Sequence, residues 1–145
     1  MSLELERTIR PPTIAAVTAF GAELDRWAAE LGLGDDARRR LLLAWDELAS
    51  NVVRHARGAS ELRVGLRPEA DGGVTLVLED DGEPFDPLDR PEPETAAPLE
   101  RRQPGGLGIH LVRQLFDRVV YRRRGGRNRL QVELSGASGA PERLG

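Results

Sequence analysis

The hydrophobic pattern changes its period along the first third of the chain. Apolar residues alternate with polar ones from Leu3 to Ile9, which predicts a half-buried strand that stops at Pro11. From Thr13 to about Leu31 the apolar residues recur every three to four positions, and a second such stripe runs from Asp35 to about Ala56. The pattern therefore predicts a strand followed by two amphipathic helices.

The rest of the chain predicts four more strands and one more helix. The expected strands are Leu62 to Leu66, Val74 to Leu78, Val119 to Arg123 and Leu130 to Leu134, and the expected helix is Leu107 to about Asp117. Between them, Asp80 to Pro104 carries six prolines and almost no regular period, which is typical of a long loop that serves as a lid or is partly disordered.

This order of elements predicts an α+β fold. We expect a two-layer α/β sandwich in which the helices cover one face of a mixed, mostly antiparallel sheet. A chain of 145 residues has the size of one domain, which we place at residues 1–134, with a flexible Gly/Ala/Ser-rich tail at 135–145.

Composition and charge exclude several classes of function. The net charge is −3 with dispersed charges, which argues against binding nucleic acid through its backbone. There is no cysteine, so disulfides, thiolate metal sites and cysteine nucleophiles are excluded. No signal peptide and no long apolar run is present, so we expect a soluble cytoplasmic protein that does not enter a membrane.

The basic residues narrow the chemistry further because all 21 of them are arginine. Without lysine, a P-loop, a eukaryotic-type protein kinase site and Schiff-base chemistry are all excluded. Only two histidines are available, so any metal would be held by oxygen atoms, which favours a hard cation such as Mg²⁺.

Three polar signatures follow one another along this pattern. Glu47, Asn51 and Arg54 lie on the flank of the apolar stripe of the second helix, where they could line a pocket. The segment Asp80 to Gly82 ends a strand, and Gly105 to Gly108 opens a helix. A carboxylate and an amide one turn apart, an acceptor for an adenine amino group and backbone N–H groups for phosphate together indicate a nucleotide site.

In these segments the chain resembles the ATP-binding (Bergerat) domain shared by DNA gyrase, MutL and histidine kinases. It is most similar to the small bacterial branch of RsbW/SpoIIAB-type anti-sigma factor serine/threonine kinases. The resemblance spans about residues 3 to 134 and depends on three motifs, which are Asp46 to Ala56, Glu79 to Pro87 and Gly105 to Val112.

The resemblance implies a role for each matching position. Glu47 matches the general base that takes the proton of a serine hydroxyl, and Asn51 matches the ligand of Mg²⁺. Asp80 matches the acceptor of the adenine amino group, and Gly82 allows the base to approach the backbone. The phosphates of ATP would be bound by the loop residues Gly105, Gly106, Leu107 and Gly108.

The arginines near these motifs can be interpreted in more than one way. Arg54 would face phosphate, as in some histidine kinases, or would be a solvent-exposed helix residue. Either Arg101 or Arg102 would be the lid arginine that touches phosphate, and the alignment does not choose between them. His55 and His110 are interpreted as structural residues.

Three further positions carry their own expectations. Asp81 is interpreted as a turn residue, and Phe85 is expected to pack under the lid or near the base. The segment Gly125 to Arg129 departs from the family, where relatives often carry a Gly-Thr whose hydroxyl supports the aspartate. Asn128 could take over that hydrogen bond.

The resemblance implies an Mg-ATP-dependent kinase that phosphorylates a serine on an anti-anti-sigma (STAS-type) partner. It also implies that the protein sequesters a sigma factor when that partner is absent, and that it forms a homodimer. Two alternatives remain open, a nucleotide-dependent binding module without phosphotransfer and a detached histidine-kinase catalytic domain. The second alternative lacks a phosphoacceptor helix.

Overall fold

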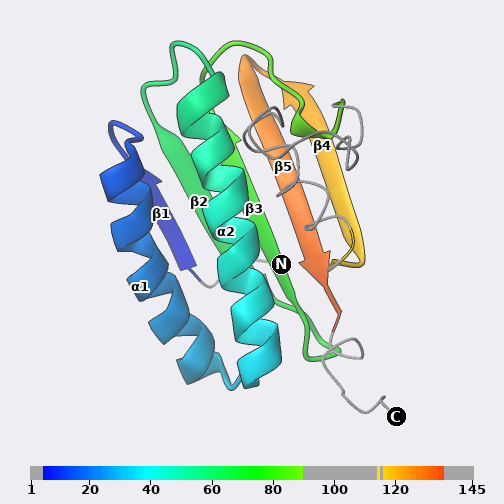
Figure 1. The fold of residues 1–145 in the computed structure, drawn as a ribbon. Coiled ribbons are helices and arrows are strands. Elements are labelled where there is room, and N and C mark those ends of the chain that lie inside the picture. Colours follow the sequence, from blue (N-terminus) through cyan, green and yellow to red (C-terminus); the bar gives the residue numbers. More distant parts are fainter. Residues whose placement is uncertain (1–4, 90–113, 115, 136–145) are drawn as a thin grey trace, which may run out of the picture.

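The described part of the chain forms one open sheet whose strands all pair antiparallel (Figure 1). The computed structural model describes residues 5–89, 114 and 116–135. The sheet has the strand order β1-β2-β3-β5-β4. Its strands are β1 (Leu5–Ile9), β2 (Leu62–Pro68), β3 (Val74–Asp80), β4 (Arg118–Arg124) and β5 (Arg127–Leu134).

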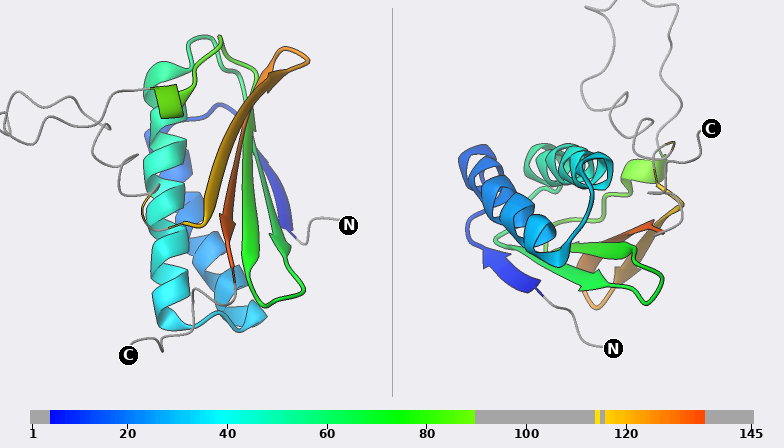
Figure 2. Two further views of the ribbon diagram at one scale, coloured as in Figure 1. Left: turned by 90° about the vertical axis from the view of Figure 1, so that its right-hand side faces the viewer. Right: turned by 90° about the horizontal axis from the view of Figure 1, so that it is seen from below.

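Two long helices lie side by side on one face of this sheet (Figure 2). Helix α1 (Ile14–Leu31) begins after Thr13, whose side chain accepts a hydrogen bond from Ala16 N at 3.1 Å. It ends at Gly32, whose φ of 92° closes the helix in the left-handed region. Helix α2 (Asp35–His55) has two aspartates in its first turn, at the positive end of the helix dipole.

The hydrophobic core lies between the two layers. Trp45 of α2 is 2% exposed and donates its indole N–H to Val17 O of α1 at 2.9 Å, so the two helices are joined by a buried hydrogen bond. The other large, fully buried apolar side chains come from both helices and the three neighbouring strands β2, β3 and β5, and they are Val17, Leu24, Leu41, Leu48, Leu62, Leu66, Val74, Leu76 and Val132.

The predicted two-layer α+β sandwich is confirmed. Along β5 buried residues alternate with half-buried ones, as the sequence pattern indicated. Neither α1 nor α2 combines the length and the hydropathy that crossing a membrane requires.

Some predicted elements fall outside the described residues. Of the helix predicted from Leu107 to Asp117, only the end is described, where Gln114 is helical and Asp117 already lies in a bend. In the predicted long loop, Asp80 still belongs to β3, and Pro87–Asp89 form a single 3₁₀ turn. The rest of that loop and the tail after residue 135 stay predictions.

Candidate nucleotide site

Three buried polar residues meet at one end of the sandwich, where α2 and β3 end and β5 begins. Asn51 lies in the last turns of α2, Asp80 is the last residue of β3, and Asn128 is the second residue of β5. Asp80 and Asn128 are direct cross-strand partners in the β3–β5 register. Helix and sheet therefore bring together residues that are far apart in the sequence.

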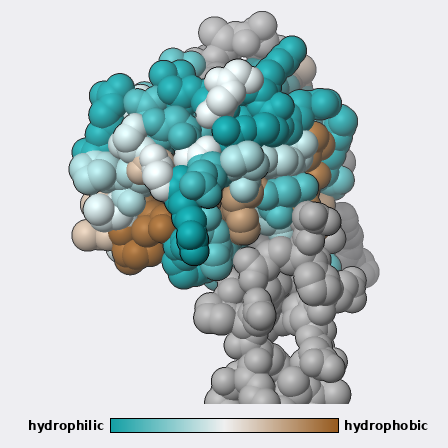
Figure 3. Space-filling view, turned by 90° about the horizontal axis from the view of Figure 1, so that it is seen from above, coloured by the Kyte–Doolittle hydropathy of each residue, from teal (hydrophilic) through white to brown (hydrophobic). Residues whose placement is uncertain are grey.

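These three residues line a small cavity of about 20 Å³, which is room for about one water molecule. The rest of its lining is apolar or aromatic and consists of Leu48, Val52, Leu78, Phe85, Pro87, Tyr121 and Leu130. Figure 3 looks onto this end of the molecule, whose described surface is mostly hydrophilic. A mostly apolar lining with a few polar groups suits a flat heterocycle. Because the cavity holds only about one water molecule, its walls would have to move apart to admit such a ring.

In the part of the chain that the structure describes, the Asp80 carboxylate is held through only one of its two oxygens. Asp80 is 3% exposed, and its Oδ1 accepts hydrogen bonds from Gly82 N at 2.8 Å and from Asn128 Nδ2 at 2.9 Å. Burial raises the pKa of Asp80, and these two hydrogen bonds act against that rise. Both bonds given by described residues end on Oδ1, so Oδ2 is left as an acceptor for a ligand.

The side-chain amide of Asn128 connects this carboxylate to three other groups. Its Nδ2 also donates to Glu83 O at 2.8 Å, while its Oδ1 accepts from Phe85 N at 3.0 Å and from the Tyr121 hydroxyl at 2.6 Å. Burial raises the pKa of Tyr121, so the hydroxyl keeps its proton and donates it. The hydrogen-bonding role that the sequence suggested for Asn128 thus appears in the structure.

Asn51 offers its amide to the same cavity. The residue is 1% exposed, and among the described residues its Nδ2 has no hydrogen-bond partner and its Oδ1 accepts only a long 3.4 Å bond from Arg54 Nη2. A buried amide with spare capacity is typical of a site that binds a polar ligand. Glu47 lies one turn earlier on α2 and is half-buried, but it does not line the cavity.

Gly82 is required where it stands because another part of the backbone lies against it. A Cβ at this position would lie 2.8 Å from Ala56 O, closer than real Cβ atoms come, and a tight 3.0 Å from Arg57 O. Arg123 Nη1 also donates to Gly82 O at 2.7 Å. The loop after Asp80 is therefore packed against the segment that follows α2.

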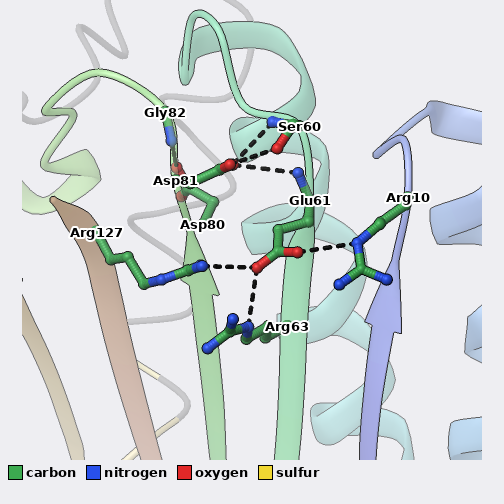
Figure 4. Close-up of polar contacts among 8 residues, drawn as sticks. All are labelled: Arg10, Ser60, Glu61, Arg63, Asp80, Asp81, Gly82 and Arg127. Carbon is green, nitrogen blue, oxygen red and sulfur yellow. Dashed lines mark hydrogen bonds and ion pairs between the residues drawn. The ribbon is translucent and has the colours of Figure 1, made fainter.

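Asp81 has a larger role than the turn position expected from the sequence. It accepts hydrogen bonds from Ser60 N at 2.8 Å, from Glu61 N at 3.1 Å and from the Ser60 hydroxyl (Figure 4). These bonds, that of the Ser60 hydroxyl most of all, lower the pKa of Asp81 to about 2. The carboxylate thus connects the end of β3 to the start of β2.

This lowered pKa predicts a loss of stability in acid. Because the pKa is about 2 in the folded protein and 3.8 in its ordinary state, the contribution of Asp81 is complete above about pH 4 and is lost as the pH falls toward 2. Asp81→Asn should therefore destabilise the protein more at about pH 6 than at about pH 3, which urea unfolding at both pH values measures. An equal effect at the two pH values would contradict this role.

Glu61 is the centre of an ion-pair network that sequence reasoning missed. Its buried carboxylate contacts Arg10 Nε at 3.0 Å, Arg63 Nε at 2.9 Å and Arg127 Nη2 at 2.7 Å (Figure 4). The hydrogen bond from Arg127 is the main cause of its lowered pKa. The network connects β2 and β5 with the segment after β1, next to the loop that carries Asp81.

Comparison with known proteins identifies the family. The histidine kinase-like ATPase domain matches residues 11–134 of this chain. The chain belongs to the histidine kinase-like ATPase family. Among curated proteins, the serine/threonine-protein kinase BtrW of Bordetella bronchiseptica is 34% identical over 111 residues, which cover 74% of this chain and 73% of BtrW. Membership of this family implies an ATP-binding domain.

Solved structures share the fold of this chain. The RsbU and RsbW domains of Rv1364c from Mycobacterium tuberculosis match with a TM-score of 0.64 and 18% identity, over 90% of this chain and 32% of that one. The SiaB-SiaC complex of Pseudomonas aeruginosa matches with a TM-score of 0.60 and 14% identity, over 91% of this chain and 89% of that one. This chain thus spans about a third of the Rv1364c chain.

Part of the ATPase motif set lies outside the described residues. This applies to the predicted phosphate loop, to both candidate lid arginines and to one histidine, that is, to Gly105, Gly106, Leu107, Gly108, Arg101, Arg102 and His110. Their roles stay predictions. Of the remaining candidates, His55 stacks on Phe85 with ring centroids 5.0 Å apart, and Phe85 lines the cavity near Asp80.

Sequence reasoning missed Tyr121 and Arg123. Both lie on β4, where Tyr121 is half-buried and Arg123 is exposed, and they pair with Leu130 and Asn128 of β5 in the strand register. The alternation of β4 predicts which of its residues face inward, but not which groups they meet there. The Tyr121 hydroxyl reaches Asn128, and the Arg123 guanidinium reaches the backbone of Gly82.

Proposed function

We propose that this protein is an Mg-ATP-dependent serine kinase that acts on an anti-anti-sigma (STAS-type) partner and sequesters a sigma factor when that partner is unavailable. The observation that carries the proposal is the meeting of Asp80 and Asn51 in one apolar cavity, with Glu47 a turn away, in a member of the ATPase family. The 34% identity to BtrW, which is named a serine/threonine-protein kinase, supports the choice of kinase.

In this proposal the adenine ring enters between the apolar walls of the cavity. Leu48 and Leu78 would contact the ring faces, and Oδ2 of Asp80, which accepts no bond from the described residues, would accept a hydrogen bond from the amino group of the base. A buried carboxylate acceptor favours adenine over guanine, which carries a carbonyl at that position.

Asn51 fits a site for Mg²⁺ between protein and phosphate. Its amide oxygen is a suitable ligand, and Mg²⁺ usually takes few protein ligands besides phosphate oxygens and water. Among the described residues no cluster of three His, Asp or Glu side chains could hold a metal alone, which fits this arrangement. The cation would neutralise phosphate charge, and Arg54, beside Asn51, would add a further positive charge.

Glu47 would handle the proton in the transfer step. Its carboxylate takes the proton of the partner's serine hydroxyl while the serine oxygen bonds to the γ-phosphorus and ADP leaves. The partner's serine would approach from the side of α2 that carries Glu47. We propose that the protein does this as a homodimer.

One observation favours a second candidate, a nucleotide-dependent switch without phosphotransfer. No hydrogen bond among the described residues orients the Glu47 carboxylate, and Glu47 does not line the cavity. A general base is usually oriented by a neighbour. In this alternative nucleotide binding alone would change the affinity for a partner. The SiaB-SiaC structure contains a protein of this fold in complex with another protein.

Transfer of labelled γ-phosphate separates the two functions. The chain is incubated with labelled ATP and Mg²⁺ beside a purified serine-bearing STAS-type protein, and the modified residue is mapped by mass spectrometry. Label on a serine supports the kinase. ATP binding without transfer to any such partner supports the switch, and label on a histidine would point to a detached histidine-kinase domain.

Replacing Asn51 should separate metal binding from nucleotide binding. Asn51→Ala should remove most of the gain in ATP affinity that Mg²⁺ provides, because the cation loses its protein ligand. ATP affinity in the presence of a chelator should change little. Calorimetric titrations with and without Mg²⁺ measure both values. If Mg²⁺ enhances ATP binding equally in parent and variant, Asn51 is not the ligand.

A further inference from the structure

Every hydrogen-bonding group of the Asn128 side chain is already used inside the protein. An amide has two N–H donors and an oxygen with two lone pairs. In Asn128 the donors go to Asp80 Oδ1 and Glu83 O, and the oxygen accepts from Phe85 N and the Tyr121 hydroxyl. The amide cannot turn over, because it would then place its NH₂ against two donors and its oxygen against two acceptors.

This saturation prevents Asn128 from reading the base directly. It is 5% exposed and lines the cavity, yet it has no donor or lone pair left for a ligand. Asn128 can therefore act on a ligand only through the groups that it holds, and one of them is the Asp80 carboxylate, bonded through Oδ1. Gly82 N donates to the same oxygen, so the two donors together hold the carboxylate with Oδ2 turned away from them.

We propose that Asn128, held in place by the Tyr121 hydroxyl, is a positioning residue that sets the selectivity of this site for a 6-aminopurine by fixing which oxygen Asp80 presents. This inference rests on the proposed nucleotide site and deepens it. Tyr121 is included in the proposal because its hydroxyl donates the 2.6 Å side-chain hydrogen bond that holds the oxygen of the Asn128 amide. Asn128 and Tyr121 act through Asp80, and neither touches the nucleotide by a hydrogen bond.

A ligand that lacks only the amino group tests this proposal. Purine riboside triphosphate keeps the ring and the phosphates of ATP but has no 6-amino group. The ratio of its Kd to that of ATP therefore reports the contact with Asp80 alone. Replacing a residue that merely supports the fold would weaken the binding of both ligands alike. Replacing a positioning residue would weaken the binding of ATP more than that of the analogue, and would so lower this ratio.

The variants are Asn128→Leu, which keeps the size but has no donor, and Tyr121→Phe, which removes only the hydroxyl. We expect the ratio to fall by about 10-fold in Asn128→Leu and by about 3-fold in Tyr121→Phe, with binding of the analogue nearly unchanged. The matched control is Gln131→Leu, on the same strand but on the opposite face of the sheet, which should leave the ratio at its parental value.

The outcomes distinguish failure of this inference from failure of the proposed function. If the parent protein binds neither ligand, the nucleotide site itself is wrong. If the parent prefers ATP and both variants keep that preference, or lose affinity for both ligands equally, Asn128 and Tyr121 are not positioning residues. Should Asn128→Leu fail to fold in a thermal unfolding assay, Tyr121→Phe still decides, because the removal of one hydroxyl is the smaller change.

Discussion

Glu47→Gln should lower phosphotransfer by ~10²- to 10⁴-fold while ATP affinity changes little, which is the usual range for the loss of a general base. The substitution keeps the size and helix propensity of the side chain and removes only its ability to take a proton. Glu47 does not line the cavity that contains Asp80, so nucleotide binding should not depend on its charge. Single-turnover transfer to a purified STAS-type partner, beside ATP titrations, measures both quantities.

The neighbouring residue supplies the control for this experiment. Asp46 is an exposed carboxylate on the same helix, so Asp46→Asn makes the same change of charge one position away. It should transfer phosphate at nearly the parental rate. Equal loss in the two variants would indicate a general effect of charge on α2, and unchanged transfer in Glu47→Gln would mean that Glu47 is not the base.

Asp80→Asn should weaken ATP binding by ~1.5–3 kcal/mol, the range for a hydrogen bond to a charged group, which is about a 10- to 150-fold rise in Kd. The structure explains why the isosteric amide cannot compensate. Gly82 N and Asn128 Nδ2 both donate to Oδ1, so the oxygen of the new amide must occupy that position. Its NH₂ group then faces the amino group of adenine, and two donors meet.

Calorimetry with ATP, GTP and purine riboside triphosphate tests this assignment. The parent should bind GTP poorly, and Asp80→Asn should bind the analogue without the amino group about as well as the parent does. Equal affinity of the parent for ATP and GTP would remove Asp80 from the adenine site.

Local patterns were sufficient to predict the elements of this fold. The helical period over α1 and α2 and the alternation over β1, β2, β3 and β5 depend on burial of one face, which is visible in any short window of sequence. The lack of lysine and cysteine excluded competing chemistries without any structure. The spacing of Glu47 and Asn51, one helical turn apart, likewise needs only the geometry of a helix.

The contacts that complete the site could not be predicted in this way. Asn128 meets Asp80 because β5 inserts beside β3 in one register, and it meets Tyr121 because β4 then lies at the edge of the sheet. The close approach of Gly82 to Ala56, and the contacts of Arg10 and Arg127 with Glu61, depend in the same way on segments far apart in the chain.

The sequence by itself determined the helices, the strands and the types of residue that could bind a nucleotide. Only the tertiary structure decided that the described residues bond one oxygen of Asp80 and leave the other, and that they use every group of the Asn128 amide. The physical reason is that helical and strand periods reflect which face of an element is buried, a local property. Which polar groups satisfy one another depends on strand order and register, and these are decided when the whole sheet packs against its helices.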